Sequence, residues 1–295
     1  MVAIKKIIIS VLSICVFAIV GYFLLELFIP GTEQTNQNNQ LASQEQMKID
    51  VDLVAIGDSL TEGVGDSTHR GGYVPMVADL LKENTHVKSV ETANYGHAGD
   101  TSKQLLTLLK ENEDAQTDLK EATIITITIG GNDIVKNFGK VGLNGSVEDF
   151  EPTIQAYEKN LNQIFELLNQ YNDQATMYIY GLYNPYHYYF SEFQELQAVF
   201  DLWNQRTLQF AEDRPNVRFV EIDSRFNPSE APQEIESPEE SADSLDEIQD
   251  KNHPYLYKED LFHPNDSGYQ IMAQALRDAI NKDLENTKAS LSMNK

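Results

Sequence analysis

One short stretch constrains this chain more than any other: Val51-Asp52-Leu53-Val54-Ala55-Ile56-Gly57-Asp58-Ser59-Leu60. An apolar run with β-branched residues ends at a glycine, and a serine follows two positions later. This pattern predicts a buried strand over 51–56 with Ser59 just past its carboxyl end. Ligands bind to open parallel sheets at that edge, because the loops there form a crevice. We therefore expect Ser59 to lie in the functional crevice.

The rest of the chain alternates between strand and helix patterns. Strands are predicted at 51–56, 87–93, 123–129, 176–180 and 217–222, and helices at 73–83, 101–110, 151–169, 191–212 and 267–281. Such alternation is typical of a parallel sheet with both faces covered, and right-handed crossovers make the domain doubly wound. The predicted fold class is α/β, a three-layer α/β/α sandwich around a five-stranded parallel sheet.

The amino-terminal segment has the features of a membrane anchor. Lys5 and Lys6 precede the apolar run 7–29, whose one charge is Glu26. About 20 apolar residues span a bilayer as a helix, whereas a cleaved signal peptide has an apolar region of about 7–15 residues and a cleavage site. We expect a transmembrane anchor over 7–29, a cytoplasmic tip over 1–6 and the remainder outside the cell membrane. Cleavage as a signal peptide, which would release a secreted protein, is the alternative.

Composition shifts divide the remainder into a linker, a domain and a tail. Residues 30–47 are rich in Gln and Asn without apolar periodicity, and predict a flexible linker. The domain is predicted over 48–285, followed by a tail over 286–295. Within the domain, 227–250 holds nine acidic residues and no basic one. We interpret it as a solvated insertion, with a role as a lid or cation-binding loop as the alternative.

Charge and cysteine content exclude several functions. The formal net charge is −24, which repels polyanions, so no nucleic acid partner is expected. The single cysteine, Cys15, excludes a disulfide within the chain and a zinc site built from cysteines.

A serine hydroxyl becomes a good nucleophile only when a base takes its proton, and the base is usually a histidine oriented by a carboxylate. Of the six histidines, His263 stands out because Asp260 precedes it by three residues and a predicted helix follows. These features make Ser59, His263 and Asp260 candidates for nucleophile, base and orienting acid. Ser67 is a second candidate nucleophile, because Gly65-Asp66-Ser67 repeats the letters of 57–59; Ser59 is preferred because it directly follows the strand.

Attack on an ester carbonyl also needs fixed donors for the oxyanion. Gly99 follows the second predicted strand and can present its backbone N–H at close range. Asn132, in Gly130-Gly131-Asn132-Asp133 after the third strand, can donate from its side-chain amide. The ordinary alternative is that these glycines make tight turns and that Asn and Asp cap helices. We expect Asp58 and Asp133 to bond loop amides.

Taken together, four blocks in order resemble the signature of the GDSL, or SGNH, hydrolase family: Gly57-Asp58-Ser59-Leu60, Gly99, Gly130-Gly131-Asn132-Asp133 and Asp260-Leu261-Phe262-His263. The resemblance extends from about residue 48 to 281. Each block is weak alone, but the ordered set is specific. The resemblance implies a flavodoxin-like sandwich and hydrolysis of carboxylic esters through a covalent acyl-enzyme.

The resemblance also implies roles for particular residues. Ser59 would be the nucleophile, His263 the base and then the acid, and Asp260 the orienting carboxylate. The oxyanion hole would consist of the Ser59 and Gly99 N–H groups and the Asn132 side chain. No metal and no cofactor are implied. The substrate would be a lipid, an acylated wall polymer or a small ester, and Tyr183 and Asn184, which follow the fourth strand, could wall its pocket.

Two other classes of function stay open at this point. A metal-dependent phosphoesterase could use Asp58, Asn132, Asp133 and His263, with Ser59 incidental. A surface binding module could keep the scaffold without turnover. A nucleotide site at 57–65 is disfavoured because Thr68 stands where a G-x-G-x-x-G starting at Gly63 needs glycine.

Overall fold

The computed structural model describes residues 48–142, 145–189, 194–227 and 253–293. Ile49–Lys295 forms one structural unit. The predicted anchor and linker, and all of 227–250 except Asn227, lie outside the described residues, so these predictions stay untested. Within the described ranges, no helix combines the length and the apolar character needed to cross a membrane.

The centre of the unit is a single parallel sheet in the order β2-β1-β3-β4-β5. Its strands are β1 (Ile49–Gly57), β2 (Val87–Gly96), β3 (Ile124–Thr128), β4 (Thr176–Tyr180) and β5 (Val217–Val220). The predicted α/β class with a five-stranded parallel sheet is confirmed. β1 lies between β2 and β3, so the loops that follow these three strands are neighbours.

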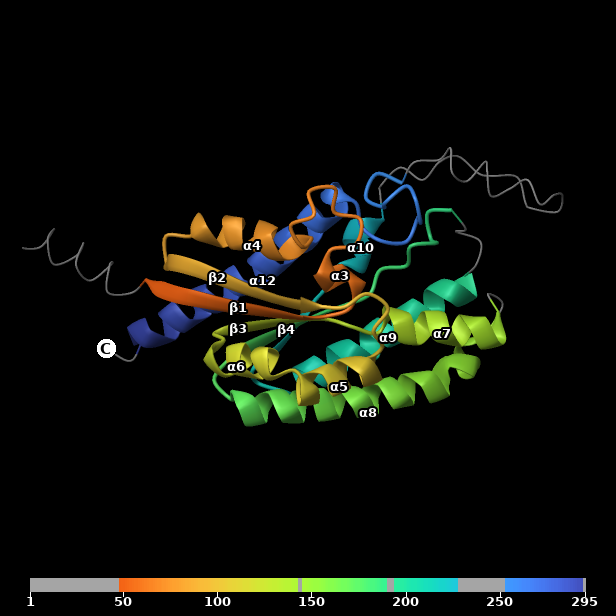
Figure 1. Ribbon diagram of the computed structural model, residues 1–295, viewed down its shortest axis with the longest axis horizontal. Coiled ribbons are helices and arrows are strands. Elements are labelled where there is room, and N and C mark those ends of the chain that lie inside the picture. The colour runs from red at the N-terminus through yellow and green to blue at the C-terminus, as the bar shows by residue number, and fades with distance from the viewer. Residues whose placement is uncertain (1–47, 143–144, 190–193, 228–252, 294–295) are drawn as a thin grey trace, which may run out of the picture. The chain divides into compact units, whose positions relative to one another are not determined.

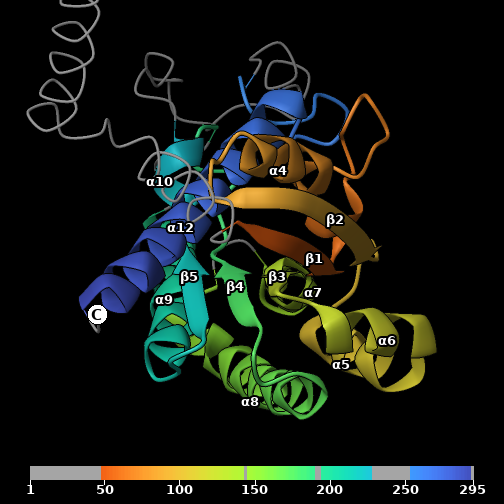
Figure 2. The ribbon, with the colours of Figure 1, turned by 90° about the vertical axis from the view of Figure 1, so that its left-hand side faces the viewer.

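Helices cover both faces of the sheet (Figure 1). Figure 2 shows α4 and α12 above the sheet, and α5, α6, α8 and α9 below it. The helices are α3 (Ser59–Glu62), α4 (Tyr73–Lys82), α5 (Ser102–Glu111), α6 (Glu113–Glu121), α7 (Gly131–Val141), α8 (Val147–Tyr171), α9 (Gln194–Glu212), α10 (Asp223–Phe226) and α12 (Asp266–Met293).

Strand β1 shows why the layers form. Successive side chains of a strand point to opposite faces of a sheet. Val54 and Ile56 belong to the apolar cluster between the sheet and helices α5 and α8. Leu53 and Ala55 belong to the cluster between the sheet and helices α4 and α12. All four are at most 3% exposed. A strand buried on both faces reads as a continuous apolar run, which is the pattern that predicted it.

Element boundaries differ from the predictions at several places. The predicted strand 217–222 ends at Val220, and α10 follows it. The last helix, predicted over 267–281, extends from Asp266 to Met293 as α12. The amphipathic pattern fades after Ile280, but the following residues contain neither Pro nor Gly, so nothing ends the helix.

Candidate active site

The loop after β1 holds Ser59 in a fixed place. Gly57 has φ +150°, and a Cβ there would lie 2.2 Å from the Thr128 carbonyl oxygen, so only glycine lets β1 end this close to β3. Asp58 then caps α3: its Oδ1 accepts a hydrogen bond from the Leu60 N–H at 3.0 Å and from the Thr128 hydroxyl at 2.8 Å. Ser59 begins α3 and is 5% exposed.

Buried hydroxyl groups continue from Asp58 through the sheet. The Thr128 hydroxyl contacts that of Thr61 at 2.7 Å, Thr61 contacts Tyr73 at 3.1 Å, and Tyr73 contacts Thr126 at 2.5 Å. This network ties α3 and the start of α4 to β3. No pattern in the sequence signals it, because its members are isolated polar residues in otherwise apolar elements.

The structure brings Ser59, His263 and Asp260 together across about two hundred residues of sequence. The Ser59 Oγ lies 2.8 Å from the His263 Nε2, and the His263 Nδ1 lies 2.6 Å from the Asp260 Oδ2. Asp260 Oδ1 also accepts from the N–H groups of Phe262 and His263, at 2.9 and 3.0 Å. Burial raises the pKa of Asp260, but the hydrogen bonds from His263 and Phe262 outweigh this and leave it below its ordinary value.

The segment that carries His263 is held by its neighbours. The His263 carbonyl oxygen accepts a hydrogen bond from the Tyr257 N–H at 2.8 Å. The Asn265 side chain donates to the carbonyls of Pro254 and Leu256, both at 3.0 Å, and caps the start of α12. These bonds hold the backbone at His263 just before α12 begins, which is where the sequence placed this residue.

The two predicted oxyanion donors, Gly99 and Asn132, follow the carboxyl ends of β2 and β3, the strands on either side of β1. Asn132 is in the first turn of α7, not in a loop as predicted, and its amide donates to the Asp100 carbonyl at 2.9 Å. Since the amide group has two hydrogens, one stays available. Gly99 is exposed, with φ +85°, in the turn after β2. Asn132 lines the same cavity as Ser59; Gly99 is not among the residues that line it.

Three contacts connect the Gly99 turn to the rest of the site. The Glu62 carboxylate, on α3, accepts from the Ala98 N–H. The Asp133 carboxylate, on α7, accepts from the N–H and the hydroxyl of Ser102, at 2.9 and 2.7 Å. Asp58 and Asp133 bond backbone amides as expected, but these amides belong to the first turns of α3 and α5 and not to loops. Glu62 was missed because its partner is 36 residues away.

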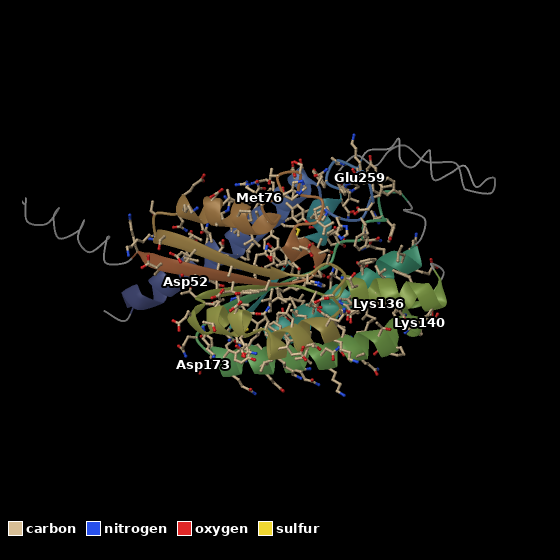
Figure 3. The ribbon with its side chains drawn as sticks, in the orientation of Figure 1. Asp52, Met76, Lys136, Lys140, Asp173 and Glu259 are labelled. Atoms are coloured by element: carbon tan, nitrogen blue, oxygen red, sulfur yellow. The ribbon has the colours of Figure 1, made fainter. Side chains whose placement is uncertain are left out.

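A narrow cavity of about 30 Å³ extends from Ser59 between α7 and the loop after β4. Its walls are mainly apolar side chains, contributed by Leu60, Val135, Phe138, Leu182, Pro185, Tyr186, Phe200 and Phe262. Figure 3 shows Lys136 of α7 and Glu259 towards the carboxyl ends of the strands, and Asp52 and Asp173 towards the other end. The cavity therefore opens on the edge of the sheet that the sequence predicted.

The two predicted pocket residues differ in position. Tyr183 lines the cavity; its ring stacks on Phe226 at 4.0 Å, and its hydroxyl donates to the Phe262 carbonyl at 2.6 Å. Asn184 is not among the lining residues. Its side chain donates to Gln197 at 2.9 Å and accepts from the Tyr186 N–H at 3.0 Å, so it holds the loop after β4.

The structure separates the two candidate nucleophiles. Ser67 is exposed, and its N–H and hydroxyl both donate to Asp266, at 2.8 and 2.5 Å. Ser59 is the one that contacts a histidine. Within the described part of the chain, no three His, Cys, Asp or Glu side chains are grouped so that they could hold a metal ion. The metal-dependent alternative therefore has no support there.

Comparison with known proteins gives consistent results. Residues 53–276 match the family model described as GDSL-like Lipase/Acylhydrolase. The uncharacterized protein YpmR of Bacillus subtilis is 31% identical over 91% of this chain and 96% of its own length. The spore germination lipase LipC of Bacillus licheniformis is 24% identical over 76% of this chain and 94% of its own.

Solved structures share the fold at lower identity. The lipase Lip_vut3 from a goat rumen metagenome has a TM-score of 0.62 and 21% identity, over 79% of this chain and 97% of that chain. Axe2, an acetylxylan esterase from Geobacillus stearothermophilus, has a TM-score of 0.51 and 21% identity, over 76% of this chain and 91% of that chain.

Proposed function

The chain belongs to the GDSL-like lipase/acylhydrolase family and is a serine hydrolase of carboxylic esters, and from this premise we propose which residues carry out the reaction. Ser59 is the nucleophile, His263 the general base and then the general acid, and Asp260 the carboxylate that orients the imidazole. One observation carries the assignment: the Ser59 Oγ, the two ring nitrogens of His263 and the Asp260 carboxylate form one chain of contacts at 2.8 and 2.6 Å.

The reaction follows from this geometry. The Ser59 Oγ attacks the ester carbonyl carbon while the His263 Nε2 takes the hydroxyl proton. Asp260 accepts from the Nδ1–H, which fixes the tautomer and stabilises the imidazolium. The proton then passes from the Nε2 to the leaving alcohol oxygen, and the C–O bond to the alcohol breaks. Water, deprotonated by the same nitrogen, attacks the acyl-Ser59 carbonyl carbon; the bond to the Ser59 Oγ then breaks, the Nε2 returns its proton to that oxygen, and the acid is released.

Developing charge on the carbonyl oxygen needs donors that are in place beforehand. The Ser59 N–H, at the start of α3, the second amide hydrogen of Asn132 and the Gly99 N–H are our candidates. Contacts of Glu62 with Ala98, and of Asn132 with Asp100, connect the Gly99 turn to α3 and α7. Rigid donors of this kind are worth several kcal/mol each.

The apolar cavity is the place we propose for the acyl group. At about 30 Å³ it has room for a short acyl chain. The relatives named as lipase and acetylxylan esterase make lipids and acetylated polysaccharides candidate substrates, along with acylated wall polymers and small esters.

For location, we propose that the hydrolase domain works outside the cell membrane. The support is the sequence: the lysine pair and the apolar run 7–29 favour a single anchor with the remainder outside. We expect the full-length protein to sediment with membranes and to be released by detergent. Recovery as a soluble, shortened chain would favour a cleaved signal peptide and a secreted enzyme instead.

The catalytic proposal is tested with two serine variants. We expect Ser59→Ala to lower kcat/KM on a butyryl aryl ester at least about a thousandfold, because the nucleophile is gone. Ser67→Ala is the comparison variant and should lose far less activity, because the Ser67 hydroxyl contacts Asp266 and the Ser59 hydroxyl contacts the His263 ring. A fluorophosphonate should label Ser59 and nothing else in the chain. Full activity in Ser59→Ala, or labelling at Ser67, would refute the assignment.

A further inference from the structure

A second hollow lies beside the candidate active site and has no part in the mechanism above. This groove, of about 510 Å³, is lined by the glycine-rich loop 63–71 together with Glu62 and Tyr257. The sequence drew attention to this loop for its glycines and for Ser67, but neither a phosphate site nor a second nucleophile accounts for it.

Both catalytic segments contribute to the walls of the groove. The Ser59 carbonyl oxygen accepts hydrogen bonds from the N–H groups of Gly63 and Val64, at 2.9 and 3.0 Å. On the other side, Tyr257 donates its N–H to the His263 carbonyl. Glu62, which lines the groove, and Ser59 are the two ends of the same short helix, α3, so about one helical turn separates their backbones.

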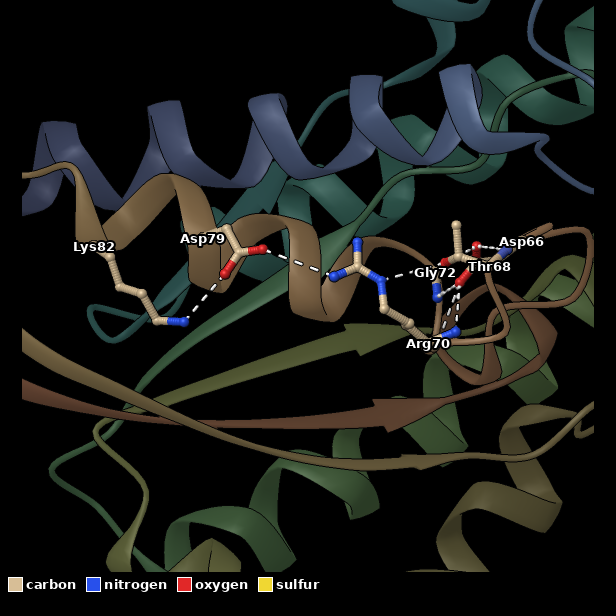
Figure 4. A network of polar contacts seen from close by, with 7 residues as sticks. Asp66, Thr68, Arg70, Gly72, Asp79 and Lys82 are labelled. Carbon is tan, nitrogen blue, oxygen red and sulfur yellow. Dashed lines mark hydrogen bonds and ion pairs between the residues drawn. The ribbon is translucent and has the colours of Figure 1, made fainter.

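The loop is held in place by a buried carboxylate. Asp66, which is 2% exposed, accepts from the N–H groups of Thr68, Arg70, Gly71 and Gly72 at 2.8 to 3.2 Å. Figure 4 shows this arrangement, with Thr68, Arg70 and Gly72 around the carboxylate. Because the amide groups satisfy Asp66 internally, its main effect is to keep the groove in a fixed shape.

The charge facing the groove is negative. None of the described residues that line it is lysine or arginine, and Glu62 is exposed there. Arg70 belongs to the loop but is not among the lining residues: its guanidinium lies 4.0 Å from the Asp79 carboxylate and donates to the Thr68 hydroxyl (Figure 4). The Glu259 carboxylate lies beside the Tyr257 hydroxyl and raises the pKa of that phenol.

In the proposed mechanism the alcohol leaves on the side of His263, because the Nε2 must reach its oxygen. The acyl group goes to the apolar cavity, which Tyr257 does not line. We propose that the groove between loop 63–71 and Tyr257 holds the alcohol portion of the ester, and that this alcohol is polar and neutral or cationic, not anionic. The inference deepens the proposed function and rests on it.

The chemistry of the lining fits such an alcohol. Glu62 can accept hydrogen bonds from sugar or glycerol hydroxyls, and the Tyr257 ring offers a face for a sugar ring or an ammonium group. A phosphate on the alcohol would meet the Glu62 carboxylate, and no lysine or arginine is among the described lining residues, where His69 is the one side chain that can take up a positive charge. Esters of phosphorylated alcohols should therefore be poor substrates.

The test compares three butyryl esters that differ in the charge of the alcohol: butyrylcholine, monobutyrylglycerol and butyryl glycerol phosphate. We expect the full-length enzyme to show a kcat/KM at least about fivefold lower on the phosphate ester than on the other two. Glu62→Gln should lower the ratio of kcat/KM on butyrylcholine to kcat/KM on butyryl glycerol phosphate about threefold, which is the effect of removing one partly exposed charge. Glutamine keeps an oxygen for the Ala98 N–H, so the Gly99 turn stays held.

Two further variants complete the design. Glu83→Gln, which makes the same change of charge on an exposed residue outside the groove, should leave the ratio unchanged. Tyr257→Ala should raise the KM for monobutyrylglycerol more than for a butyryl aryl ester. Equal kcat/KM on all three esters, or a choline-to-phosphate ratio of kcat/KM that Glu62→Gln leaves unchanged, would overturn the proposal that the groove binds the alcohol. Hydrolysis of the aryl ester would still support the proposed function in that case. If Ser59→Ala kept full aryl ester activity, both would fall.

Discussion

Replacement of Asp58 by asparagine tests the electrostatics beside the nucleophile. Burial raises the pKa of Asp58 to about 6, although hydrogen bonds from Thr128 and Leu60 act in the opposite direction. The folded protein therefore binds this proton more tightly than the unfolded chain, whose aspartates titrate near 3.9. The resulting contribution to stability is fully present below that value, and it is lost as the pH rises through about 6.

The size of the effect follows from the difference in pKa. A rise of the pKa from about 3.9 to about 6 corresponds to about 3 kcal/mol of unfolding free energy lost above pH 7, with about half of that lost at pH 5. The asparagine side chain is neutral at every pH, and its Oδ1 can still accept from Leu60 and Thr128. Burying its amide hydrogens costs about 1–2 kcal/mol. We therefore expect Asp58→Asn to be about 1–2 kcal/mol more stable than the wild type at pH 8.

Urea unfolding at pH 5 and pH 8 measures this directly. The advantage of Asp58→Asn should be about 1–1.5 kcal/mol larger at pH 8 than at pH 5. Asp52→Asn is the matched control, because it makes the same change of charge at a partly exposed position on β1, the strand that precedes Asp58. An Asp58→Asn effect that is the same at both pH values would refute the claim that the buried carboxylate is strained by its charge.

Two further substitutions test the site and its backbone. Asp260→Asn should lower kcat on a butyryl aryl ester by about 10²–10⁴-fold at unchanged melting temperature, since the amide favours the wrong tautomer of His263; a loss under tenfold would remove Asp260 from the mechanism. Gly57→Ala should destabilise the protein by at least about 3 kcal/mol in urea unfolding, because the new Cβ would meet the Thr128 carbonyl oxygen. The control, Gly139→Ala, adds a Cβ in open space on α7 and should stabilise the protein by about 0.5–1 kcal/mol. Similar effects of the two substitutions would show that β1 and β3 can separate at Gly57.

Much of the sheet could be predicted because β1, β3 and β4 are buried on both faces. Such strands show as short apolar runs, and Thr176–Tyr180 matches its prediction at both ends. Helices α6 and α7 could not be predicted in this way. α6 is mostly polar, with Ala115 and Leu119 as its buried residues, and α7 starts at Gly131, inside a stretch whose glycines and Asn predict a loop.

The positions of the site residues could be predicted from their place after strands, but the partners of their side chains could not be predicted. Ser59 and Asn132 each follow a strand closely, so parallel pairing alone brings them to one edge. The contacts of Asp58 with Thr128 and of Glu62 with Ala98 cross 70 and 36 residues and carry no local pattern. Tyr183 was predicted to line the cavity, but Val135 and Phe138 were missed, because no helix was predicted where α7 lies.

The strand order explains how three of the four blocks come to lie side by side. Because β1 lies between β2 and β3, the segment that carries Ser59 has one oxyanion candidate on each side, Gly99 after β2 and Asn132 after β3. His263 has no strand of its own, and its position depends on hydrogen bonds made by Tyr257 and Asn265. The nucleophile and its oxyanion donors are thus as rigid as the sheet, whereas the base is only as well placed as a loop. Substrate alcohols that bind against Tyr257 would touch that loop, so binding in the groove and alignment of the base are physically coupled.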